Sequence, residues 1–580
     1  MGRTRRWSAF WRTLATPLWV SRMVFLVGVC SFLGAFLPNI ASRTRIINEM
    51  VPAVFPAAAT TATAAIGLLL IWLSRALRRG KFRAWLIALV LSVIAVGMHV
   101  LHDLQIEAAT LCLLLVALLA SSRRNFTARP DPRSKLRLGA VAIGGPAAAA
   151  ALGASWWAVR GAHLPTTTIW VALAVLALAA LLLIVTTAIE PGGGPHRLTA
   201  EEHARVRALI DEWGWADSLA YFATRDDRFV VFSPSGQSAI SYRVIGSVSL
   251  AAGDPLGNPA DWPHAITAWL DEARAYGWTP GNLGASERAA AAFDRAGLEV
   301  LEVGDEAIVH VAEFSLEGRS MRGVRQAVAR VERAGITAEC YRVRDLTTQQ
   351  RIAFREKAIA WRDGAIERGF SMALGRFGQR RDDDGVVVVA RTPSGELAGL
   401  LSFAPWGKDG ASLDLMRRSR TAEVPQNGIV EFMVTSLMND AERLGITKIS
   451  LNFSAFRSTF ARGERLGAGP ATRAWRAILM WASHFAQIEA LYRSNSKYRP
   501  EWVPRFVVYP RATDLAQVAT AAIRAEALVA APGWYRRLTG NDGRGNAIDE
   551  IPEIESEAHV PAGAVVEREH EVDDDRAESR

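Results

Sequence analysis

Two charged residues lie at the end of a predicted strand in the second half of the chain. Asp414 alternates with Leu413 and Leu415 in ASLDLM (411–416), so its side chain faces away from theirs, and Arg417 follows three residues later. A carboxylate in such a place can act as a general base, and a guanidinium can hold a phosphate through two parallel hydrogen bonds. The alternative is a structural ion pair between Asp414 and Arg417, and the sequence leaves both roles open.

Two further cations, Lys497 and Arg499, flank Tyr498 in the segment NSKYRPEW (495–502). Lys497 is one of six lysines in a chain with 61 arginines, so a lysine at this place is unusual for this protein. Cations beside aromatic residues and proline predict a rigid basic wall of a binding site. The alternative is a surface turn held by aromatic packing.

A predicted helix over 428–444 carries Glu431 in its first turn. The helix dipole favours an acid there, and the same carboxylate can also recognise an amino group. A second helix, over 316–335, is rich in arginine, and spacings of three and eight residues bring several of these to one face. That face is either simply solvated or a surface for nucleic acid phosphates. The candidate phosphate-binding residues are Arg322, Arg325 and Arg330.

Several kinds of chemistry are excluded by spacing. Cys30, Cys112 and Cys340 lie far apart and form no C-x-x-C pair, which argues against a disulfide scaffold and a cysteine zinc site. No Ser-His-Asp order appears, which leaves covalent serine catalysis without support. The segment after 411–416 lacks the glycine-rich loop that coenzyme A requires. We therefore expect neither a cofactor nor a metal.

The elements that must position these residues alternate in two similar series. The first series has strands near 229–232, 238–244, 278–283, 298–303 and 306–312 and helices near 263–276 and 286–296. The second has a helix at 347–368, strands at 386–390, 396–404 and 411–416, a helix at 428–444 and a strand at 448–453. Strand, strand, strand, helix, strand is typical of the acyltransferase core of the GCN5-related (GNAT) type. We expect an α+β domain of two tandem GNAT-like lobes.

The first third of the chain has the pattern of a membrane domain. A helix of about 20 apolar residues crosses the hydrocarbon core. Six apolar segments precede residue 190, at 23–41, 51–73, 84–101, 105–120, 138–159 and 164–189. Sixteen Lys and Arg residues lie on one predicted side of these segments and three on the other. The positive-inside rule then places the N-terminus and everything after 190 in the cytoplasm, so we expect a multi-pass protein of the bacterial cell membrane.

Length and composition agree with such a division. The chain has 580 residues, 50% of them apolar and 22% charged, which excludes collagen-like and globally disordered proteins. The net charge is +9, although residues 541–580 contain 13 acidic and 4 basic residues. We expect a basic body that attracts anions and an acidic disordered tail. The predicted units are 1–22, basic N-terminus; 23–190, membrane domain; 191–199, linker; 200–315, first lobe; 316–335, basic helix; 336–515, second lobe; 516–540, C-terminal helix; 541–580, tail.

Seven motifs, taken together, resemble one protein family. They are GDPLGNP (253–259), EGRSMRGVRQA (317–327), SLDLMRR (412–418), NGIVEFM (427–433), LNFSAFR (451–457), RLGAGP (465–470) and QIEALYRSNSKYRPEWVPRF (487–506). The set is similar to the cytoplasmic synthase domain of bacterial phosphatidylglycerol aminoacyltransferases, the multiple peptide resistance factor family, in its actinobacterial branch. The similarity covers about 200–515. The fused lysyl-tRNA synthetase of that branch is not expected here, and six spans are fewer than in full-length flippases of the family.

The resemblance implies an activity. Family members move an amino acid from aminoacyl-tRNA to the glycerol hydroxyl of phosphatidylglycerol, which lowers the negative charge of the membrane and gives resistance to cationic antimicrobial peptides. Lysine is the favoured amino acid, and a separate synthetase charges the tRNA. The expected partners are therefore aminoacyl-tRNA, phosphatidylglycerol and the lipid bilayer, with a possible homo-oligomer. The resemblance assigns catalysis to Asp414, Arg417, Lys497 and Arg499. It assigns substrate binding to Glu431, Asn452 and Arg505.

The sequence leaves two other functions open. One is a tRNA-dependent transferase that acts on a lipid-linked peptidoglycan precursor, since such ligases share the doubled lobe and the basic helix. The other is a lipid flippase or transporter with an inactive soluble domain. The transporter hypothesis requires functional polar residues within the spans, and apart from Glu107 no span carries an acid or a base in its middle.

Overall fold

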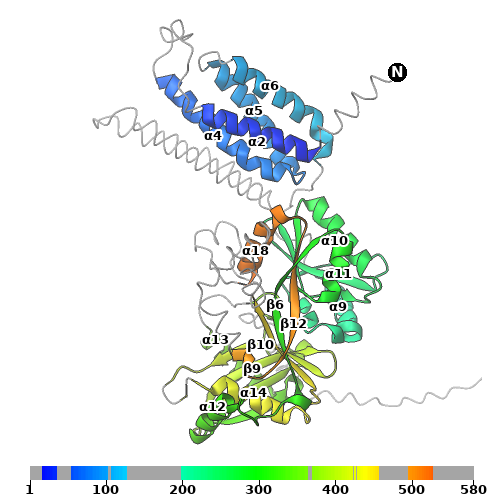
Figure 1. Ribbon diagram of the computed structural model, residues 1–580, viewed down its shortest axis with the longest axis vertical. Helices are drawn as coiled ribbons and strands as arrows, with labels where there is room; N and C mark the ends of the chain where they lie inside the picture. Colours follow the sequence, from blue (N-terminus) through cyan, green and yellow to red (C-terminus); the bar gives the residue numbers. More distant parts are fainter. Residues whose placement is uncertain are drawn as a thin grey trace, which may run out of the picture.

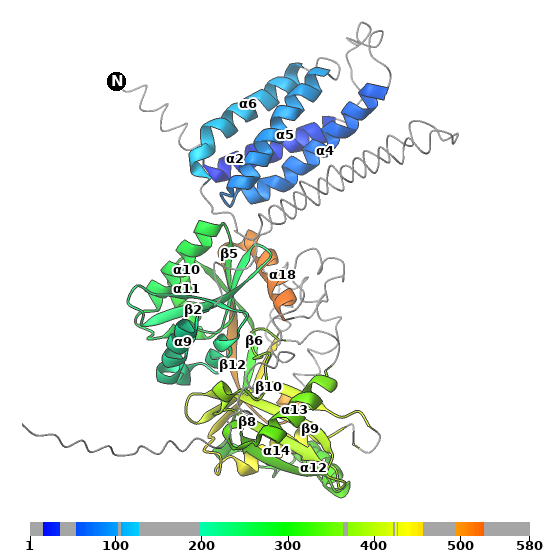
Figure 2. The same ribbon diagram turned by 180° about the vertical axis from the view of Figure 1, so that it is seen from behind.

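The computed structural model describes residues 16–34, 54–101, 106–126, 198–362, 369–421, 424–425, 427–455 and 494–526. These residues form a helical bundle and a larger domain built on one mixed sheet (Figures 1 and 2). The α+β architecture expected for the second part is confirmed. The apolar segments 138–159 and 164–189, residues 191–197 of the linker, the motif RLGAGP and the acidic tail lie outside the described residues.

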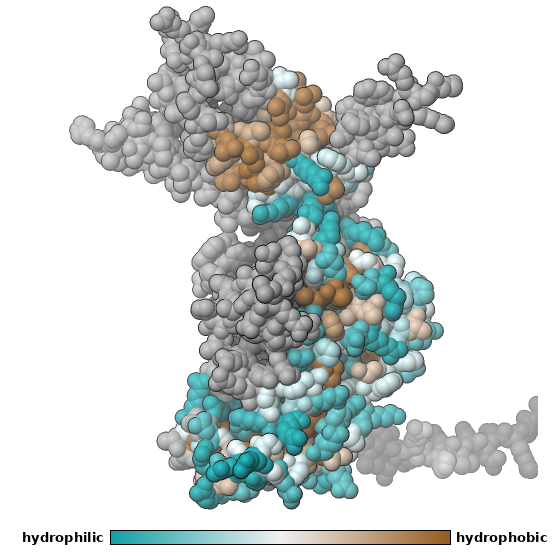
Figure 3. Space-filling view, in the orientation of Figure 1, coloured by the Kyte–Doolittle hydropathy of each residue, from teal (hydrophilic) through white to brown (hydrophobic). Residues whose placement is uncertain are grey.

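The described part of the bundle contains α2 (Pro17–Gly34), α4 (Val54–Leu77), α5 (Phe82–Leu101) and α6 (Ile106–Ser122). Helices α2 and α4 approach closely at Gly28 and Gly67, where a Cβ atom on either residue would lie within 3 Å of the other's carbonyl oxygen. Many large apolar side chains of the bundle are exposed (Figure 3), among them Leu113 and Leu114. Within the described residues, no helix meets the combined length and hydrophobicity needed to cross a membrane. The membrane domain stays a prediction.

The second domain contains a twelve-stranded sheet in the order β1-β2-β3-β5-β12-β6-β11-β10-β9-β8-β7, and β4 pairs with β2. Within the paired strands that the structure describes, only β3 with β5 and β10 with β11 are parallel. The strands are β1 (Phe229–Phe232), β2 (Ser238–Ile245), β3 (Val248–Ala252), β4 (Leu256–Gly257), β5 (Thr279–Ala285), β6 (Glu299–His310), β7 (Thr337–Arg342), β8 (Val386–Arg391), β9 (Leu397–Trp406), β10 (Gly410–Arg418), β11 (Lys448–Ala455) and β12 (Glu501–Tyr509).

The two lobes exchange their last strands. β6 follows the first lobe in the sequence but pairs with β11 of the second, whereas β12 follows the second lobe and pairs with β5 of the first. β6 and β12 also pair with each other over nine residues of β12, Glu501 to Tyr509. Each lobe is therefore completed by a strand from the other half of the chain, and the centre of the sheet belongs to both.

Helices cover both faces of the sheet. On the first lobe, α10 (Trp262–Tyr276) and α11 (Glu287–Arg295) cover one face, and α18 (Leu515–Ala525) covers the other. On the second lobe, α12 (Arg322–Arg333) and α14 (Ile429–Asp440) cover one face, and α13 (Thr348–Ala360) packs on the other. Helix α9 (Ala200–Trp213) begins at a capping box in which Thr199 and Glu202 satisfy each other's backbone amides.

The loop between α4 and α5 joins the bundle to the sheet domain. Arg78 Nη2 donates to Thr513 Oγ1 at 3.3 Å, just before α18, and Lys81 Nζ donates to Ser247 Oγ at 3.3 Å in the β2–β3 turn. Arg79 donates to Gln517 of α18. Helix α18 therefore lies on the side of the domain that faces the bundle (Figure 1), whereas α12 lies at the far end.

Candidate functional site

Strands β10 and β11 separate at a fork in the second lobe. Their parallel pairing runs from Gly410 to Ser412 on β10 and ends at Ser450 on β11. Immediately beyond, β10 has a register shift at Asp414 in its pairing with β9, and β11 shifts between Ser450 and Phe453 in its pairing with β6. Bulges bend strands and redirect side chains. The fork therefore places Asp414 and its neighbours where the sheet is no longer continuous.

Asp414 is held by backbone and hydroxyl donors. Its Oδ1 accepts from the Leu374 N–H at 2.7 Å, and its Oδ2 accepts from Ser402 Oγ at 3.4 Å. Arg417 donates through Nε to the Ala358 carbonyl at 3.3 Å, at the end of α13. Different elements thus hold the two side chains. The partly buried carboxylate has a fixed orientation, as a general base requires.

Lys497 and Glu431 come together on the other side of the fork. Lys497 Nζ donates to Glu431 Oε1 at 2.6 Å, although the residues are 66 positions apart in the sequence. The segment that carries Lys497 is attached to β11, because Asn495 Nδ2 donates to the Leu451 carbonyl at 2.9 Å. The structure thus brings together two residues that the sequence had selected separately. Arg499 is exposed and has a φ of 54°, which is uncommon for a residue other than glycine.

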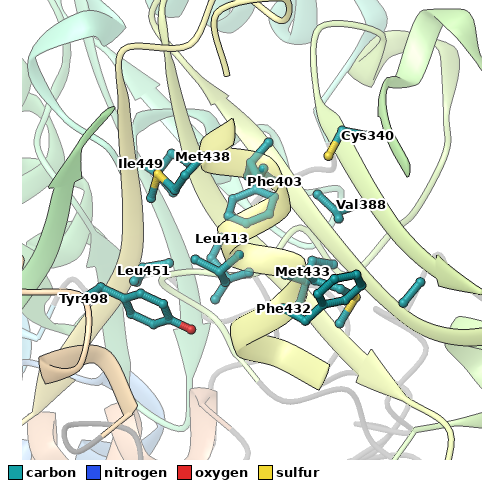
Figure 4. Packing of buried hydrophobic residues seen from close by; sticks show 14 of the residues in the cluster. Cys340, Val388, Phe403, Leu413, Phe432, Met433, Met438, Ile449, Leu451 and Tyr498 are labelled. Carbon is teal, nitrogen blue, oxygen red and sulfur yellow. The ribbon is translucent and has the colours of Figure 1, made fainter. Parts of the chain in front are cut away.

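Tyr498 packs inside the fork rather than on the surface. Its ring lies against Leu451 and Leu413, in the apolar cluster that Phe432 and Met433 of α14 complete (Figure 4). Its hydroxyl is buried and has no hydrogen-bond partner within the part of the chain that the structure describes. Burial, and then the charge of Glu431, raise the pKa of Tyr498. Sequence reasoning had treated Tyr498 only as the residue between two cations.

Asn452 lies at the bulge of β11, with a φ of 70°. Its backbone N–H donates to Ser450 Oγ at 3.3 Å, and its side-chain Oδ1 is buried without a partner among the described residues. Left-handed backbone is strained except in glycine and, to a smaller degree, asparagine and aspartate. Such strain commonly occurs at functional sites.

Arg505 is buried in an ionic cluster beneath the fork. Its Nε donates to Glu306 Oε2 at 2.9 Å, its Nη1 to Asp217 Oδ1 at 2.8 Å and its Nη2 to Ser218 Oγ at 2.8 Å. Glu306 is fully buried and also accepts from Ser450 of β11. These contacts occupy the Arg505 guanidinium with internal partners. The geometry is that of a residue that positions the strands, and its prediction as a substrate-binding residue remains untested.

A cavity of about 270 Å³ lies next to this cluster in the first lobe. Its wall includes Trp213, Trp215, Trp262, Asp217 and Asp254. The Asp254 carboxylate accepts from the backbone N–H of Ser286 at 2.7 Å and from its hydroxyl at 2.6 Å. Desolvation and the neighbouring Asp217 carboxylate raise the pKa of Asp254 to about 7. Asp254 belongs to GDPLGNP, where sequence reasoning noted the motif without assigning a role to the acid.

The basic helix α12 buries one face and exposes its arginines. Val324, Val328 and Val331 pack into the second lobe, whereas Arg322 and Arg330 are exposed. Arg325 is different, since its Nη1 donates to the Gly318 carbonyl at 2.8 Å and so fixes the preceding loop. The helix lies beside the N-terminus of α14, where a Cβ atom on Gly428 would come within 2.8 Å of the Ala327 carbonyl oxygen.

The described residues contain no group of three or more His, Cys, Asp or Glu side chains arranged to hold a metal ion. Seven of the ten predicted site residues separate into two groups. Asp414, Asn452, Lys497 and Glu431 surround the fork, whereas Arg322, Arg325 and Arg330 lie on α12. Acyl transfer uses a proton acceptor such as Asp414, a cation such as Lys497 and hydrogen-bonding groups such as Asn452 Oδ1 and the Tyr498 hydroxyl, both unpaired within the described residues.

Comparison with known proteins identifies the family of the chain. The family model described as phosphatidylglycerol lysyltransferase, C-terminal, matches residues 207–509, which is more than half of the chain. The chain belongs to this family. The matched region of this phosphatidylglycerol lysyltransferase relative includes both lobes, the fork and both exchanged strands.

Several proteins are similar in sequence. The lysylphosphatidylglycerol biosynthesis bifunctional protein LysX of Rhodococcus opacus (strain B4) is 48% identical over 386 residues, which are 67% of this chain and 34% of that protein. The protein of the same name from Mycobacterium tuberculosis (strain F11) is 48% identical over 353 residues, 61% of this chain and 30% of that protein. The chain thus spans about a third of the length of these relatives. The solved structure of L-PGS from Bacillus licheniformis is 21% identical, with a TM-score of 0.48, and covers 59% of this chain and 97% of that one.

Proposed function

We propose that this protein is a membrane-bound aminoacyltransferase that moves lysine from lysyl-tRNA to phosphatidylglycerol. Family membership and the names of the relatives support the product, lysylphosphatidylglycerol. The observation that carries the proposal is the fork. There Asp414 is oriented by the Leu374 amide, and Lys497 and Glu431 form an ion pair on the opposite side.

The reaction exchanges one ester for another. Asp414 accepts the proton of the terminal glycerol hydroxyl, whose oxygen attacks the carbonyl carbon of the lysyl ester. The bond to the ribose oxygen of the tRNA then breaks, and that oxygen takes up a proton. Lys497, or a donor near it, stabilises the negative charge that develops on the carbonyl oxygen. Atoms and charges balance without ATP, a metal or a redox partner.

The charges of the chain suit both substrates. tRNA is a polyanion, and Arg322 and Arg330 present exposed cations to it on α12. Phosphatidylglycerol carries one negative charge in a membrane, and anionic lipid attracts basic segments near the bilayer surface. The apolar surface of the bundle supports its place in the cell membrane, with the sheet domain in the cytoplasm. A lysyl-tRNA synthetase supplies the charged tRNA.

Expression in a heterologous host tests the proposal. Lipids extracted from cells that produce the chain are analysed by mass spectrometry, beside cells that produce Asp414→Asn. The proposal predicts lysylphosphatidylglycerol with the unchanged protein only. A lysylated peptidoglycan precursor would favour the ligase alternative. The transporter alternative would be favoured if no sample contained lysylphosphatidylglycerol and if the protein altered the distribution of labelled lipid between the leaflets.

A reporter fused after Gly194 tests the location. The proposal requires activity of a cytoplasm-dependent reporter at this position and none from a periplasm-dependent reporter. The opposite result would separate the sheet domain from tRNA and contradict the proposed donor.

A further inference from the structure

Arg228 is a buried arginine whose hydrogen-bonding groups are only partly used. It lies immediately before β1, and its side chain is 1% exposed. Its Nη2 donates to the Phe370 carbonyl at 2.7 Å, and its guanidinium lies 4.2 Å from the centroid of the Phe370 ring. Its Nε and Nη1 are buried without any partner in the described part of the chain. Burying a charge without a partner is energetically unfavourable. Neither Nε nor Nη1 of Arg228 donates to a carboxylate in the described part of the chain.

The neighbouring carboxylates are already engaged. Asp227 accepts from Arg225 at 2.8 Å and from Arg243 at 3.0 Å. The Glu526 carboxylate accepts from the backbone amides of Phe370 and Ser371. Burial, and then the like charge of Arg225, lower the pKa of Arg228 to about 9, so it remains charged at neutral pH. Arg225, Arg228 and Arg243 outnumber the two neighbouring carboxylates, so the cluster keeps an excess positive charge that an anion would neutralise.

The 369–378 loop connects this arginine to the proposed general base. Phe370 stacks on Arg228, Ala373 accepts a hydrogen bond from Arg225 through its carbonyl, and Leu374 donates its amide to Asp414. Arg228 and Asp414 therefore both form hydrogen bonds with the backbone of this one short loop. In phosphatidylglycerol, the terminal hydroxyl lies on the third carbon from the phosphate ester oxygen. A phosphate bound at Arg228 would therefore hold that hydroxyl three carbons away from the phosphate ester oxygen, beside the loop that also contacts Asp414.

The position of the loop favours a lipid over tRNA as the source of the anion. Phe370 packs in the cluster formed with Leu515 and Val518 of α18. Helix α18 is the element that Arg79 of the bundle contacts, and it faces the bundle (Figure 2). The exposed arginines of α12 lie at the opposite end of the domain. An acceptor from the bilayer reaches the loop from the α18 side.

We propose that Arg228 binds the phosphate of the lipid acceptor and that the 369–378 loop brings the bound headgroup to Asp414. The inference rests on the proposed function, because it assigns the acceptor side of that reaction. Nε and Nη1 each retain an N–H without a partner among the described residues, and a charge-assisted hydrogen bond from either can reach a phosphate oxygen. Binding requires Phe370 to move from its place over the guanidinium, so the ring acts as a cover that the headgroup displaces.

Calorimetry with the full chain in detergent tests the assignment without the reaction. The ligands are glycerophosphoglycerol, which is the soluble headgroup, inorganic phosphate, and uncharged tRNA. We expect the headgroup to bind more tightly than inorganic phosphate. We expect Arg228→Met to weaken headgroup binding about 10–100-fold, the effect of losing hydrogen bonds to a charged group, and to leave tRNA binding unchanged. Arg228→Lys, which keeps the charge but loses the planar fork, should fall between the two.

The matched control is Arg243→Met. Arg243 contacts the same Asp227 but is partly exposed, so headgroup binding should change by no more than about fivefold, the range of a partly exposed ion pair. Unchanged headgroup binding in folded Arg228→Met and Arg228→Lys would overturn the inference. Equal affinity for inorganic phosphate, or a loss confined to tRNA, would also overturn it. If the wild type binds the headgroup through Arg228 but transfers no lysine, the proposed function fails and the binding site stands.

Discussion

Lys497 and Glu431 form a 2.6 Å ion pair that joins the segment before β12 to the first turn of α14. Glu431 is mostly buried, whereas the Lys497 side chain is 44% exposed. The lysine is therefore oriented by a carboxylate on one side and open on the other. Orientation of this kind is useful for catalysis, because the donor is in place before charge develops on the substrate.

Exchanging the charges of Lys497 and Glu431 tests whether this ion pair acts in catalysis or only in the structure. Lys497→Met should reduce lysyl transfer about 10²–10³-fold, the usual cost of losing a donor to a developing oxyanion. The double variant Lys497→Glu, Glu431→Lys restores the ion pair but moves the ammonium, so we expect no recovery of transfer. Thermal melting should change little, because a partly exposed pair contributes about 0–1 kcal/mol. Recovery of transfer by the double variant would make the pair structural.

Asp414→Asn keeps the shape of the side chain and removes the proton acceptor. Its amide oxygen can still accept from the Leu374 N–H, now at 2.7 Å, so folding should survive. Transfer should fall about 10²–10⁴-fold if Asp414 is the general base. The assay uses purified protein, lysyl-tRNA and phosphatidylglycerol, beside a melting curve. Wild-type transfer would remove Asp414 from the mechanism, and a parallel loss of stability would make it a structural residue.

Replacement of Arg322 and Arg330 by Ser tests the basic helix. Both are exposed, and the buried valines of α12 are unchanged. The slope of log affinity for tRNA against log salt should fall by about 0.7–0.9 for each lost phosphate contact. Arg274→Ser is the control, because this exposed arginine lies on α10 of the first lobe. An unchanged slope would leave α12 as a solvated surface.

Glu306→Gln tests the ionic cluster. The change leaves Arg505 buried with less negative charge around it, and the loss of one partner from a buried pair costs about 3–5 kcal/mol. Urea unfolding should show this loss as a lower midpoint with the same slope. The double variant Glu306→Gln, Arg505→Met should lose less than the sum of the single losses. Additive losses would show that Glu306 and Arg505 do not depend on each other.

The raised pKa of Asp254 predicts how stability depends on pH. The folded-state pKa of about 7 lies above the ordinary value of 3.8, so the folded protein holds this proton more tightly than the unfolded chain. The contribution of Asp254 to stability is therefore greatest below pH 3.8, falls as the pH rises from 3.8 to about 7, and is level above that. Asp254→Asn should flatten this fall in unfolding measured across the window. Asp294→Asn on the exposed side of α11 should not, and equal curves for wild type and Asp254→Asn would contradict the assignment.

Much of the second lobe could be predicted from local pattern. Continuous apolar runs and turn residues located β8, β9 and β10, and helical period located α14. Other strands escaped for physical reasons. β3 is short and rich in small residues, and β12 contains Pro504, which normally argues against a strand. Gly304 and Asp305 divided β6 into two predicted strands, whereas the structure has one continuous strand with a bulge.

The candidate site divides in the same way. Asp414, Glu431 and Lys497 could be selected because residue type and motif single them out. Glu306 and Asp217 could not, because their partner Arg505 lies 199 and 288 positions away. Arg228 could not be selected from the sequence for a similar reason. Its role is inferred from the absence of partners for two of its N–H groups among the described residues. Ion pairs between residues so far apart in the sequence, and donors left without a partner, can be recognised only in the folded chain.

The exchange of β6 and β12 determines when this protein can fold during its synthesis. The first lobe has its own helices and strands, and β5 pairs with β3, but the other edge of β5 obtains its partner only when residues 501–509 have left the ribosome. Until then β5 and β6 present unpaired backbone edges, and such edges are prone to wrong association. Lobe-by-lobe completion during translation is therefore impossible. The two halves must finish together, after almost the whole catalytic region has been made.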